Sequence, residues 1–259
     1  MKDDSDSSTV DVEATRLAAD IDRQGYGVIC NYVTGTELEA VRARAVAALK
    51  AAGCEYVGFN GADAAFAGTI LAELPRSEAF KKLCRRLYER GTGKTAPDVS
   101  FYQVCRCLTG KAGRKHSYAF HYDSYALTVV LPVQIPTEGP RGDLLVFPNV
   151  RSMRRLYLTN LLDKVLIENR VSQAVLLFAF RKGWWKGAAV RLRPGDMYFF
   201  WGNRSLHTNE PCDPDALRVT AVFHYGKEYE NNPLRLRLEN MRRWGRRPLT
   251  SASSPALRP

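Results

Sequence analysis

The chain has 259 residues, of which 45% are hydrophobic, and it carries a formal net charge of +11. This length suits one large domain or two small ones and is enough to bury a substantial core. No apolar run approaches the roughly 20 residues of a membrane helix, and the acidic first residues do not resemble a secretory signal, so we expect a cytoplasmic protein without a membrane span.

The first thirty residues predict a tail, a helix and a short strand. Residues 1–9 are acidic and Ser-rich and show no apolar periodicity, so we expect a disordered tail. A helix is predicted over residues 12–23, and Gly25 breaks it. The apolar residues 28–30 that follow favour a strand.

The clearest helix signal in the sequence begins at Thr36. Thr36 and Glu39 have the spacing of a capping box, in which each side chain satisfies a free backbone N–H of the first turn. Apolar residues then recur at helical spacing until Gly53, which should end the helix. A further helix is predicted over residues 77–90.

From about residue 99 the pattern changes to short strands separated by turns. Strands are predicted over residues 99–108, 127–135, 144–147, 190–192, 197–201 and 218–225. Such a series favours a β-sandwich or barrel, so the chain is predicted to be mainly β with flanking helices. Residues 151–182 read as helical and form an insertion between the two halves of this core, suited to core packing, to a lid or to a dimer face.

Two of the four histidines stand in a pattern typical of a metal site. His121 and Asp123 are two residues apart, so in an extended segment both side chains point to the same face. His207 follows a Pro-Gly-Asp turn and an aromatic strand. Two imidazoles and one carboxylate on one face of an octahedral ion leave three positions open, which is the arrangement of non-haem iron(II) oxygenases.

Arg218 adds weight to this interpretation, since H-x-D alone arises often by chance. It lies eleven residues after His207, at the start of the next predicted strand. A fixed guanidinium can hold a carboxylate through two parallel hydrogen bonds. Thr220, two residues further on, would share its face and could add a hydroxyl donor.

These segments together resemble the motifs of the Fe(II)/2-oxoglutarate-dependent dioxygenases. The likeness rests on residues 120–123, 195–207 and 218–220, and the start of the chain loosely resembles phytanoyl-CoA-dioxygenase-like members. The resemblance implies a double-stranded β-helix (jelly-roll or cupin) core over about 99–226. It predicts one oxygenase domain over 10–244, with the helical insertion at about 151–182 and a basic flexible tail at 245–259.

The family's residue roles can be carried onto matching positions. The resemblance implies that His121, Asp123 and His207 bind Fe(II). It implies that Arg218, helped by Thr220, binds the distal carboxylate of 2-oxoglutarate, with Tyr102 as a further candidate contact. Family members consume O2 and release succinate and CO2. Related halogenases replace the carboxylate ligand with a small residue, so the presence of Asp123 favours hydroxylation.

The substrate is not encoded in these motifs. The positive net charge is compatible with a small-metabolite substrate, including an anionic one, and this is our first hypothesis. A macromolecular or carrier-bound substrate is the alternative, because the C-terminal stretch is rich in arginine and Trp184 and Trp185 could stack bases. Nucleic acid is disfavoured, because His224 stands where the nucleic-acid demethylases carry a second arginine. A homodimer through the helical insertion and a non-enzymatic jelly-roll module complete the alternatives.

Overall fold

The computed structural model describes residues 4–53, 55–60, 64–109, 117–154, 157–227 and residue 233. The strands are β1 (Gly27–Ile29), β2 (Tyr56–Asn60), β3 (Tyr102–Leu108), β4 (Tyr125–Gln134), β5 (Leu144–Phe147), β6 (Ala188–Val190), β7 (Met197–Phe200), β8 (Leu206–Asn209) and β9 (Arg218–Lys227). The helices are α1 (Asp4–Gln24), α2 (Gly35–Ala52), α3 (Ile70–Glu73), α4 (Glu78–Thr92), α6 (Tyr157–Glu168) and α7 (Arg170–Arg181), with 3₁₀ turns η1 (Ala64–Phe66) and η2 (Leu74–Arg76).

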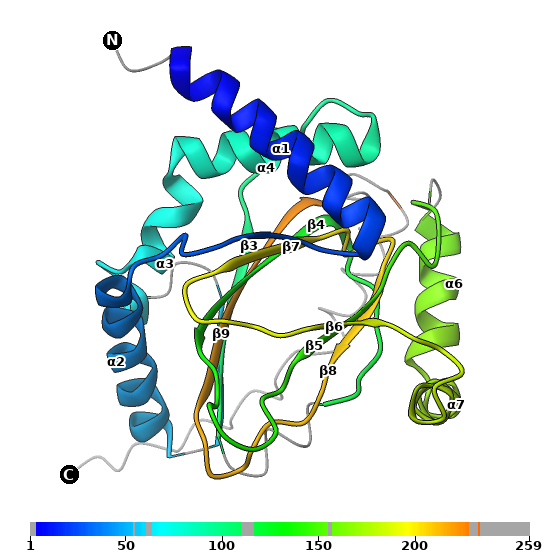
Figure 1. Ribbon diagram of the computed structural model, residues 1–259. Coiled ribbons are helices and arrows are strands. Elements are labelled where there is room, and N and C mark those ends of the chain that lie inside the picture. Colours follow the sequence, from blue (N-terminus) through cyan, green and yellow to red (C-terminus); the bar gives the residue numbers. More distant parts are fainter. Residues whose placement is uncertain are drawn as a thin grey trace, which may run out of the picture.

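Two antiparallel sheets form the centre of the molecule. The larger sheet has the strand order β1-β7-β4-β9-β3-β2, and the smaller has the order β6-β5-β8. The chain passes from one sheet to the other between β4 and β5, between β6 and β7, and again on either side of β8. Figure 1 shows the two sheets facing each other, with α1, α2 and α4 outside the larger sheet and α6 and α7 beside the smaller one. The predicted jelly-roll fold class is thereby confirmed.

Alternation along the strands decides which side chains face the interior between the sheets. On β9, Val219, Ala221 and Phe223 pack against the N-terminal helices, so the residues between them point the other way. Those residues include Arg218, Thr220 and His224, which line the central cavity. The larger sheet therefore has an apolar face under the helices and a partly polar face toward the smaller sheet.

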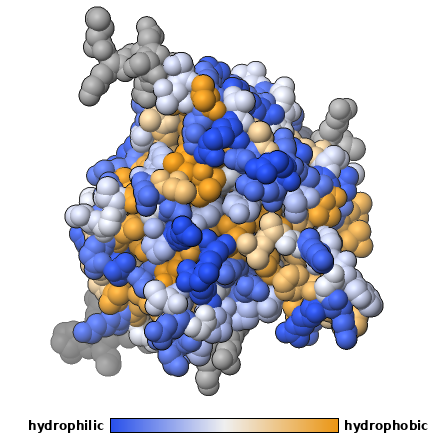
Figure 2. All heavy atoms as spheres, in the orientation of Figure 1, coloured by the Kyte–Doolittle hydropathy of each residue, from blue (hydrophilic) through white to orange (hydrophobic). Residues whose placement is uncertain are grey.

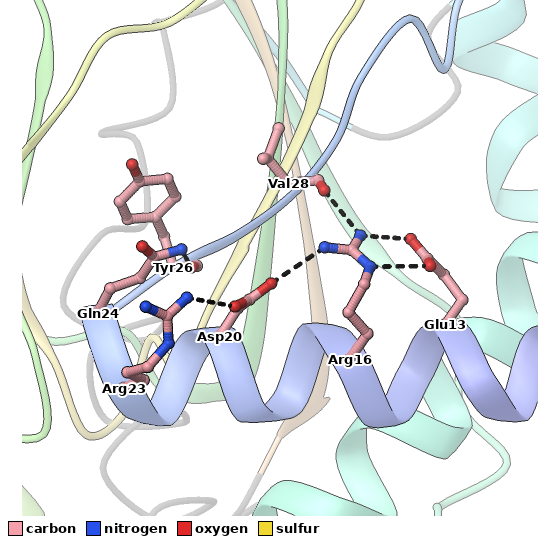
Figure 3. Close-up of polar contacts among 7 residues, drawn as sticks. All are labelled: Glu13, Arg16, Asp20, Arg23, Gln24, Tyr26 and Val28. Carbon is pink, nitrogen blue, oxygen red and sulfur yellow. Dashed lines mark hydrogen bonds and ion pairs between the residues drawn. The ribbon is translucent and has the colours of Figure 1, made fainter.

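Helix α1 lies across the outer face of the larger sheet and is attached to β1. Its buried side, which includes Leu17 and Ile21, joins the main hydrophobic core. Its exposed side carries a chain of ion pairs, shown in Figure 3, in which Arg16 bonds Glu13 and Asp20. Arg16 Nη2 also donates to the Val28 carbonyl at 2.9 Å, and this bond ties the helix to the edge strand.

Helix α1 begins earlier than the sequence indicated. It starts at Asp4, so the described part of the expected disordered tail, residues 4–9, is helical. Serine and acidic residues suit the first turns of a helix as well as they suit disorder, because they cap free N–H groups and complement the helix dipole. The composition of a short polar segment therefore could not separate the two states.

The capping box of α2 lies two residues before the predicted one. Thr34, rather than Thr36, is the N-cap, and it exchanges hydrogen bonds with Glu37 rather than Glu39. The segment contains two Thr-x-x-Glu patterns in overlapping registers, and Val33, which is buried beside the Gly195 loop, fixes the entry of the chain. The predicted end is confirmed, because Gly53 closes the helix in the left-handed conformation with φ of 58°.

The helical insertion packs on the outer face of the smaller sheet. Leu144 and Val146 of β5 face the larger sheet, while Leu145 and Phe147 face α6 and α7. The inward side chains of α7 and Trp185 complete this outer cluster. The layers of the molecule are therefore N-terminal helices, larger sheet, smaller sheet and insertion. In the part of the chain that the structure describes, none of the helices has the length and apolar character of a membrane span.

Candidate metal centre

Backbone pairing brings the two histidines of the predicted triad together. The His121 amide donates to the His207 carbonyl at 3.0 Å, and the His207 amide donates back at 3.1 Å. Residues paired in this way lie side by side, and the two imidazole centroids are 4.3 Å apart. Asp123 is fixed in turn by its own amide, which donates to the Gly202 carbonyl at 2.9 Å.

The three side chains converge on one point. His121, Asp123 and His207 each offer a ligand atom, and these atoms lie within 4.8 Å of one another. Asp123 Oδ2 is 3.4 Å from His207 Nε2, and Asp123 Oδ1 is 3.8 Å from His121 Nε2. Ligand atoms at roughly 2.0–2.2 Å from one ion would be about 3 Å apart, so small movements would seat a transition metal here.

The orientation of both imidazoles is set by backbone carbonyls. His121 Nδ1 lies 2.8 Å from the Ala119 carbonyl, and His207 Nδ1 lies 3.0 Å from the Ser205 carbonyl. A carbonyl can only accept, so in the neutral form of each ring Nδ1 carries the proton and Nε2 has a free lone pair. This outer contact is the usual way in which proteins fix the tautomer of a metal-binding histidine.

The protonation states also suit a cation. Burial, together with the neighbouring His207, lowers the pKa of His121 to about 4, so His121 is neutral at neutral pH. Burial alone would raise the pKa of Asp123, but the imidazoles of His207 and His224 outweigh it and hold the pKa well below its usual range. The site thus presents a neutral imidazole at His121 and an ionised carboxylate at Asp123 beside the His207 ring, and two imidazoles with one carboxylate are the donor set that iron(II) takes in mononuclear oxygenases.

Three residues around Asp123 were missed by sequence reasoning. Thr128 donates to Asp123 Oδ2 at 2.5 Å, and His224 places Nδ1 3.6 Å from the same oxygen. A Cβ added to Gly202 would lie 2.5 Å from Asp123 Oδ2, so only glycine lets this loop approach the carboxylate. None of these positions belongs to a motif. Thr128 lies five residues from Asp123, whereas the places of Gly202 and His224 depend on pairings with segments far away in the chain.

Arg218 lies in the same cavity as the triad and is buried with unused hydrogen-bonding capacity. Its Nη atoms make only long contacts of 3.4 Å to Thr220 and Asn209, and its buried Nε has no partner. Burial lowers its pKa to about 10, so it stays charged at neutral pH. In the described residues no carboxylate forms an ion pair with it. A buried, unpaired guanidinium calls for an anionic ligand.

The cavity has an inner and an outer part. The inner part, about 50 Å³, contains the triad with Arg218, Thr220 and His224. The outer part, about 300 Å³, is lined by Tyr56, Leu108, Ala119, Thr208, Glu210 and Cys212. Arg106, His121, Asn209 and Arg218 line both parts. Arg106, on β3, is a second cation at the site that the sequence analysis did not single out.

Tyr102 does not line either part of this cavity. It lies on β3 and stacks on Tyr125 with ring centroids 5.7 Å apart, and Tyr125 in turn stacks on His224 at 5.0 Å. These rings lie beyond His224, on the side away from Arg218 and Arg106. The cavity therefore gives Tyr102 no direct contact with a ligand held between the triad and Arg218, and its predicted role stays a prediction.

By sequence the chain matches no family model and no curated protein. Its structure matches a prolyl hydroxylase from Trichoplax adhaerens, in complex with a hypoxia-inducible-factor peptide (TM-score 0.56, 14% identity, covering 89% of this chain and 96% of that one). It also matches a Pseudomonas putida prolyl-4-hydroxylase (0.52, 12%, 82% and 98%) and SnoK, a non-haem α-ketoglutarate-dependent carbocyclase from nogalamycin biosynthesis (0.51, 19%, 85% and 89%).

The chain has the fold of the Fe(II)/2-oxoglutarate-dependent oxygenases. At these low identities the likeness establishes the architecture, and the chemistry has to be argued from the residues. The oxygenase fold and the local geometry agree, because the His121–Asp123–His207 cluster lies between the two sheets of the jelly roll and opens into the cavity that holds Arg218.

Proposed function

We propose that this chain is an Fe(II)/2-oxoglutarate-dependent oxygenase that hydroxylates a C–H bond of a small molecule bearing an anionic group. The observation that carries the proposal is the presence of two sites in one cavity. A two-histidine, one-carboxylate cluster can hold iron(II), and the unpaired Arg218 can hold a carboxylate. 2-Oxoglutarate has one carboxylate for each of these two sites, and Thr220 stands beside the second.

Each residue then has a defined task. Bound iron(II) would supply the activation of oxygen, with 2-oxoglutarate as co-substrate and succinate and CO2 as products. His121, Asp123 and His207 would hold the metal, and the Ala119 and Ser205 carbonyls keep Nε2 of each histidine free for it. Arg218 would fix the far carboxylate of 2-oxoglutarate, and buried apolar residues such as Phe200 and Leu144 exclude water from this part of the cavity.

Succinate formation with iron(II), ascorbate and 2-oxoglutarate tests the chemistry. Asp123→Ala should lose metal binding and both substrate-dependent and uncoupled succinate formation. Glu78→Ala removes a carboxylate that is 87% exposed on α4 and should behave like the unmodified protein. If Asp123→Ala bound iron and formed succinate at the unmodified rate, the metal assignment would be wrong.

Arg106 supports an anionic substrate. It faces both parts of the cavity, and its charge lowers the pKa of His121, His224 and Arg218. No carboxylate of the described residues pairs with it, and Glu210 is the one acid in the outer cavity lining. A volume of about 300 Å³ suits a small molecule. The alternative of base stacking is weakened, because Trp185 packs against Phe147 with centroids 4.2 Å apart.

A panel of carboxylic acids, each paired with its primary amide, tests this choice. Acids should stimulate 2-oxoglutarate turnover more than their amides. Arg106→Gln should remove that preference and leave the KM for 2-oxoglutarate unchanged. A raised KM for 2-oxoglutarate with the preference intact would instead assign Arg106 to the co-substrate and overturn its role in substrate recognition.

A further inference from the structure

Helix α6 presents four of its apolar side chains to solvent and three polar ones to the protein, while Ile167 packs against the smaller sheet. Asn160, Asp163 and Lys164 point inward, where Asn160 is buried and Lys164 donates to Ser124 Oγ at 2.8 Å. The opposite side carries apolar residues that are 54–62% exposed, namely Leu158, Leu162, Val165 and Leu166. This is the reverse of a normal surface helix, whose apolar stripe faces the core.

The apolar surface continues onto α7 and the turn after it. Val171, Val175, Phe178 and Trp184 are 51–74% exposed, and Trp184 packs edge-on against Phe178. With the four residues of α6 they make up what we call the hairpin face. It holds eight of the thirteen exposed large hydrophobic residues in the described parts of the chain. Figure 2 shows apolar atoms at the right-hand edge, where Figure 1 places α6 and α7. Such a concentration marks a surface that binds something.

The charges around the hairpin face indicate what it binds. Arg170, Arg181, Lys182 and Lys186 are exposed around it, and Glu168 is the exposed acid of the two helices. A second copy of the chain would bring the same cations to a two-fold contact, and the whole chain carries +11, so self-association would be repulsive. The C-terminal stretch of the same chain, after residue 227, is not a suitable occupant of the face either. It is also rich in arginine, so the basic rim would repel it.

We propose that the hairpin face docks on an anionic lipid surface. Apolar side chains, an exposed tryptophan and a basic rim are the components of helices that lie in the membrane interface. Each helix has twelve residues, which is too short to cross a bilayer but suits a position along it. The lipid headgroups supply the negative charge that the rim lacks, and the acyl region takes up the apolar side chains.

The hairpin is attached directly to the segment that carries two of the candidate metal ligands. The Gln173 side chain both accepts from the Phe120 amide and donates to the Phe120 carbonyl, at 2.8 Å each. The Arg151 guanidinium, which bonds Asp163 of α6, lies 3.9 Å from the centre of the Tyr122 ring. A membrane under the hairpin face would therefore lie one layer away from residues 120–124, which carry His121 and Asp123.

Flotation of the full-length protein with vesicles tests the docking. The protein should float with vesicles of phosphatidylcholine mixed with phosphatidylglycerol, much less with phosphatidylcholine alone, and binding should fall with salt. Leu162→Glu/Leu166→Glu should lower the partition coefficient by about tenfold or more. The control Val12→Glu/Val46→Glu adds the same charges at exposed valines of α1 and α2 and should bind nearly as well as the unmodified protein.

The basic rim needs its own pair of variants. Lys182→Gln/Lys186→Gln should lower binding about tenfold, whereas Arg44→Gln/Lys50→Gln, which removes two exposed charges from α2, should change it little. Thermal unfolding checks that each variant is folded. The proposal would be overturned if each control lost as much vesicle binding as its hairpin-face variant, or if the unmodified protein did not float with anionic vesicles. A dimer in analytical ultracentrifugation that Leu162→Glu/Leu166→Glu dissociates would also overturn it, because a second copy would then cover the face.

Discussion

At the scale of single residues, the candidate metal site depends on the residues packed closely around Asp123 as much as on the metal ligands themselves. Asp123 is held by three neighbours: the nearby Thr128 hydroxyl and, from distant parts of the chain, the Gly202 carbonyl and the His224 ring. The Gly202 contact holds the Asp123 backbone, and the other two hold its carboxylate before any metal arrives. A ligand that needs no rearrangement binds more tightly, so the residues around Asp123 should matter nearly as much as Asp123 itself.

Gly202→Ala tests this dependence on close approach. The added methyl would lie 2.5 Å from Asp123 Oδ2 and would force either the carboxylate or the loop to move. We expect the affinity for Mn(II), measured by calorimetry, to fall about 10- to 100-fold. Gly35→Ala is the control, because a Cβ at Gly35 meets no atom within 4 Å. Unchanged affinity in Gly202→Ala would mean that the position of Asp123 does not depend on this packing.

Arg218→Lys tests the second half of the site. Lysine keeps the charge but loses the two parallel donors that match a carboxylate, so the KM for 2-oxoglutarate should rise about tenfold or more. Metal affinity in the absence of 2-oxoglutarate should not change. Arg193→Lys, at an exposed arginine, serves as control. A KM that stays constant in Arg218→Lys would remove Arg218 from the proposed 2-oxoglutarate site.

At the scale of elements, the start of α2 shows how local signals act in competition. Thr34→Ala should destabilise the protein by about 1 kcal/mol in chemical unfolding, because it removes the acceptor of the Glu37 amide. Thr36→Ala, two residues on and inside the first turn, should cost little. A larger loss in Thr36→Ala than in Thr34→Ala would restore the register that the sequence alone suggested.

The pH dependence of the same cap has a defined sign. The hydrogen bonds from the Thr34 side chain and backbone lower the pKa of Glu37 below its ordinary value. A carboxyl with a lowered folded pKa stabilises the protein above its unfolded pKa, and this contribution is lost as pH falls through the folded value. The difference in stability between Thr34→Ala and the unmodified protein should therefore shrink in acid.

The elements that sequence analysis found, and those it missed, differ in where their signals come from. Long strands such as β4 and β9 carry enough alternating and β-branched residues to be predicted within a few residues. Strand β2 was missed because Tyr56–Asn60 contains a central glycine and owes its conformation to pairing with β3. The metal ligands were found because H-x-D and Arg218 keep fixed spacings. Arg106 and Gly202 were missed because their places in the site depend on strand order.

At the scale of the whole molecule, an ion cluster around the buried Arg151 side chain ties the insertion to the turn that joins the two sheets. Asp163 of α6 accepts from Arg151 at 2.7 Å and from Arg154 at 2.6 Å. The Arg151 side chain is only 5% exposed and also donates to the Asn203 carbonyl, in the turn beside Gly202. Helix α6, the β7–β8 turn and the Tyr122 ring therefore share one guanidinium. Because Tyr122 lies between His121 and Asp123, this cluster links the insertion to the candidate metal site.

The stability cost of Asp163→Ala should show that this cluster differs from an ordinary surface ion pair. Asp20 on α1 is a matched control: its side chain is also 21% exposed and also binds two arginines, but those arginines are 45% and 71% exposed. Asp20→Ala should cost less than about 1 kcal/mol, as expected for exposed pairs. Asp163→Ala leaves the Arg151 charge buried without its partner and should cost about 3 kcal/mol or more in chemical unfolding.

The same pair of variants shows whether the insertion supports the metal site. If Arg151 holds Tyr122 in place only while Asp163 holds Arg151, Asp163→Ala should also weaken Mn(II) binding several-fold under conditions where the protein remains folded, and Asp20→Ala should not. Weakened stability with unchanged metal affinity would mean that the 120–124 segment is positioned by the His121–His207 pairing alone. In that case the insertion could move on a membrane, or on any other partner, without disturbing the metal ligands.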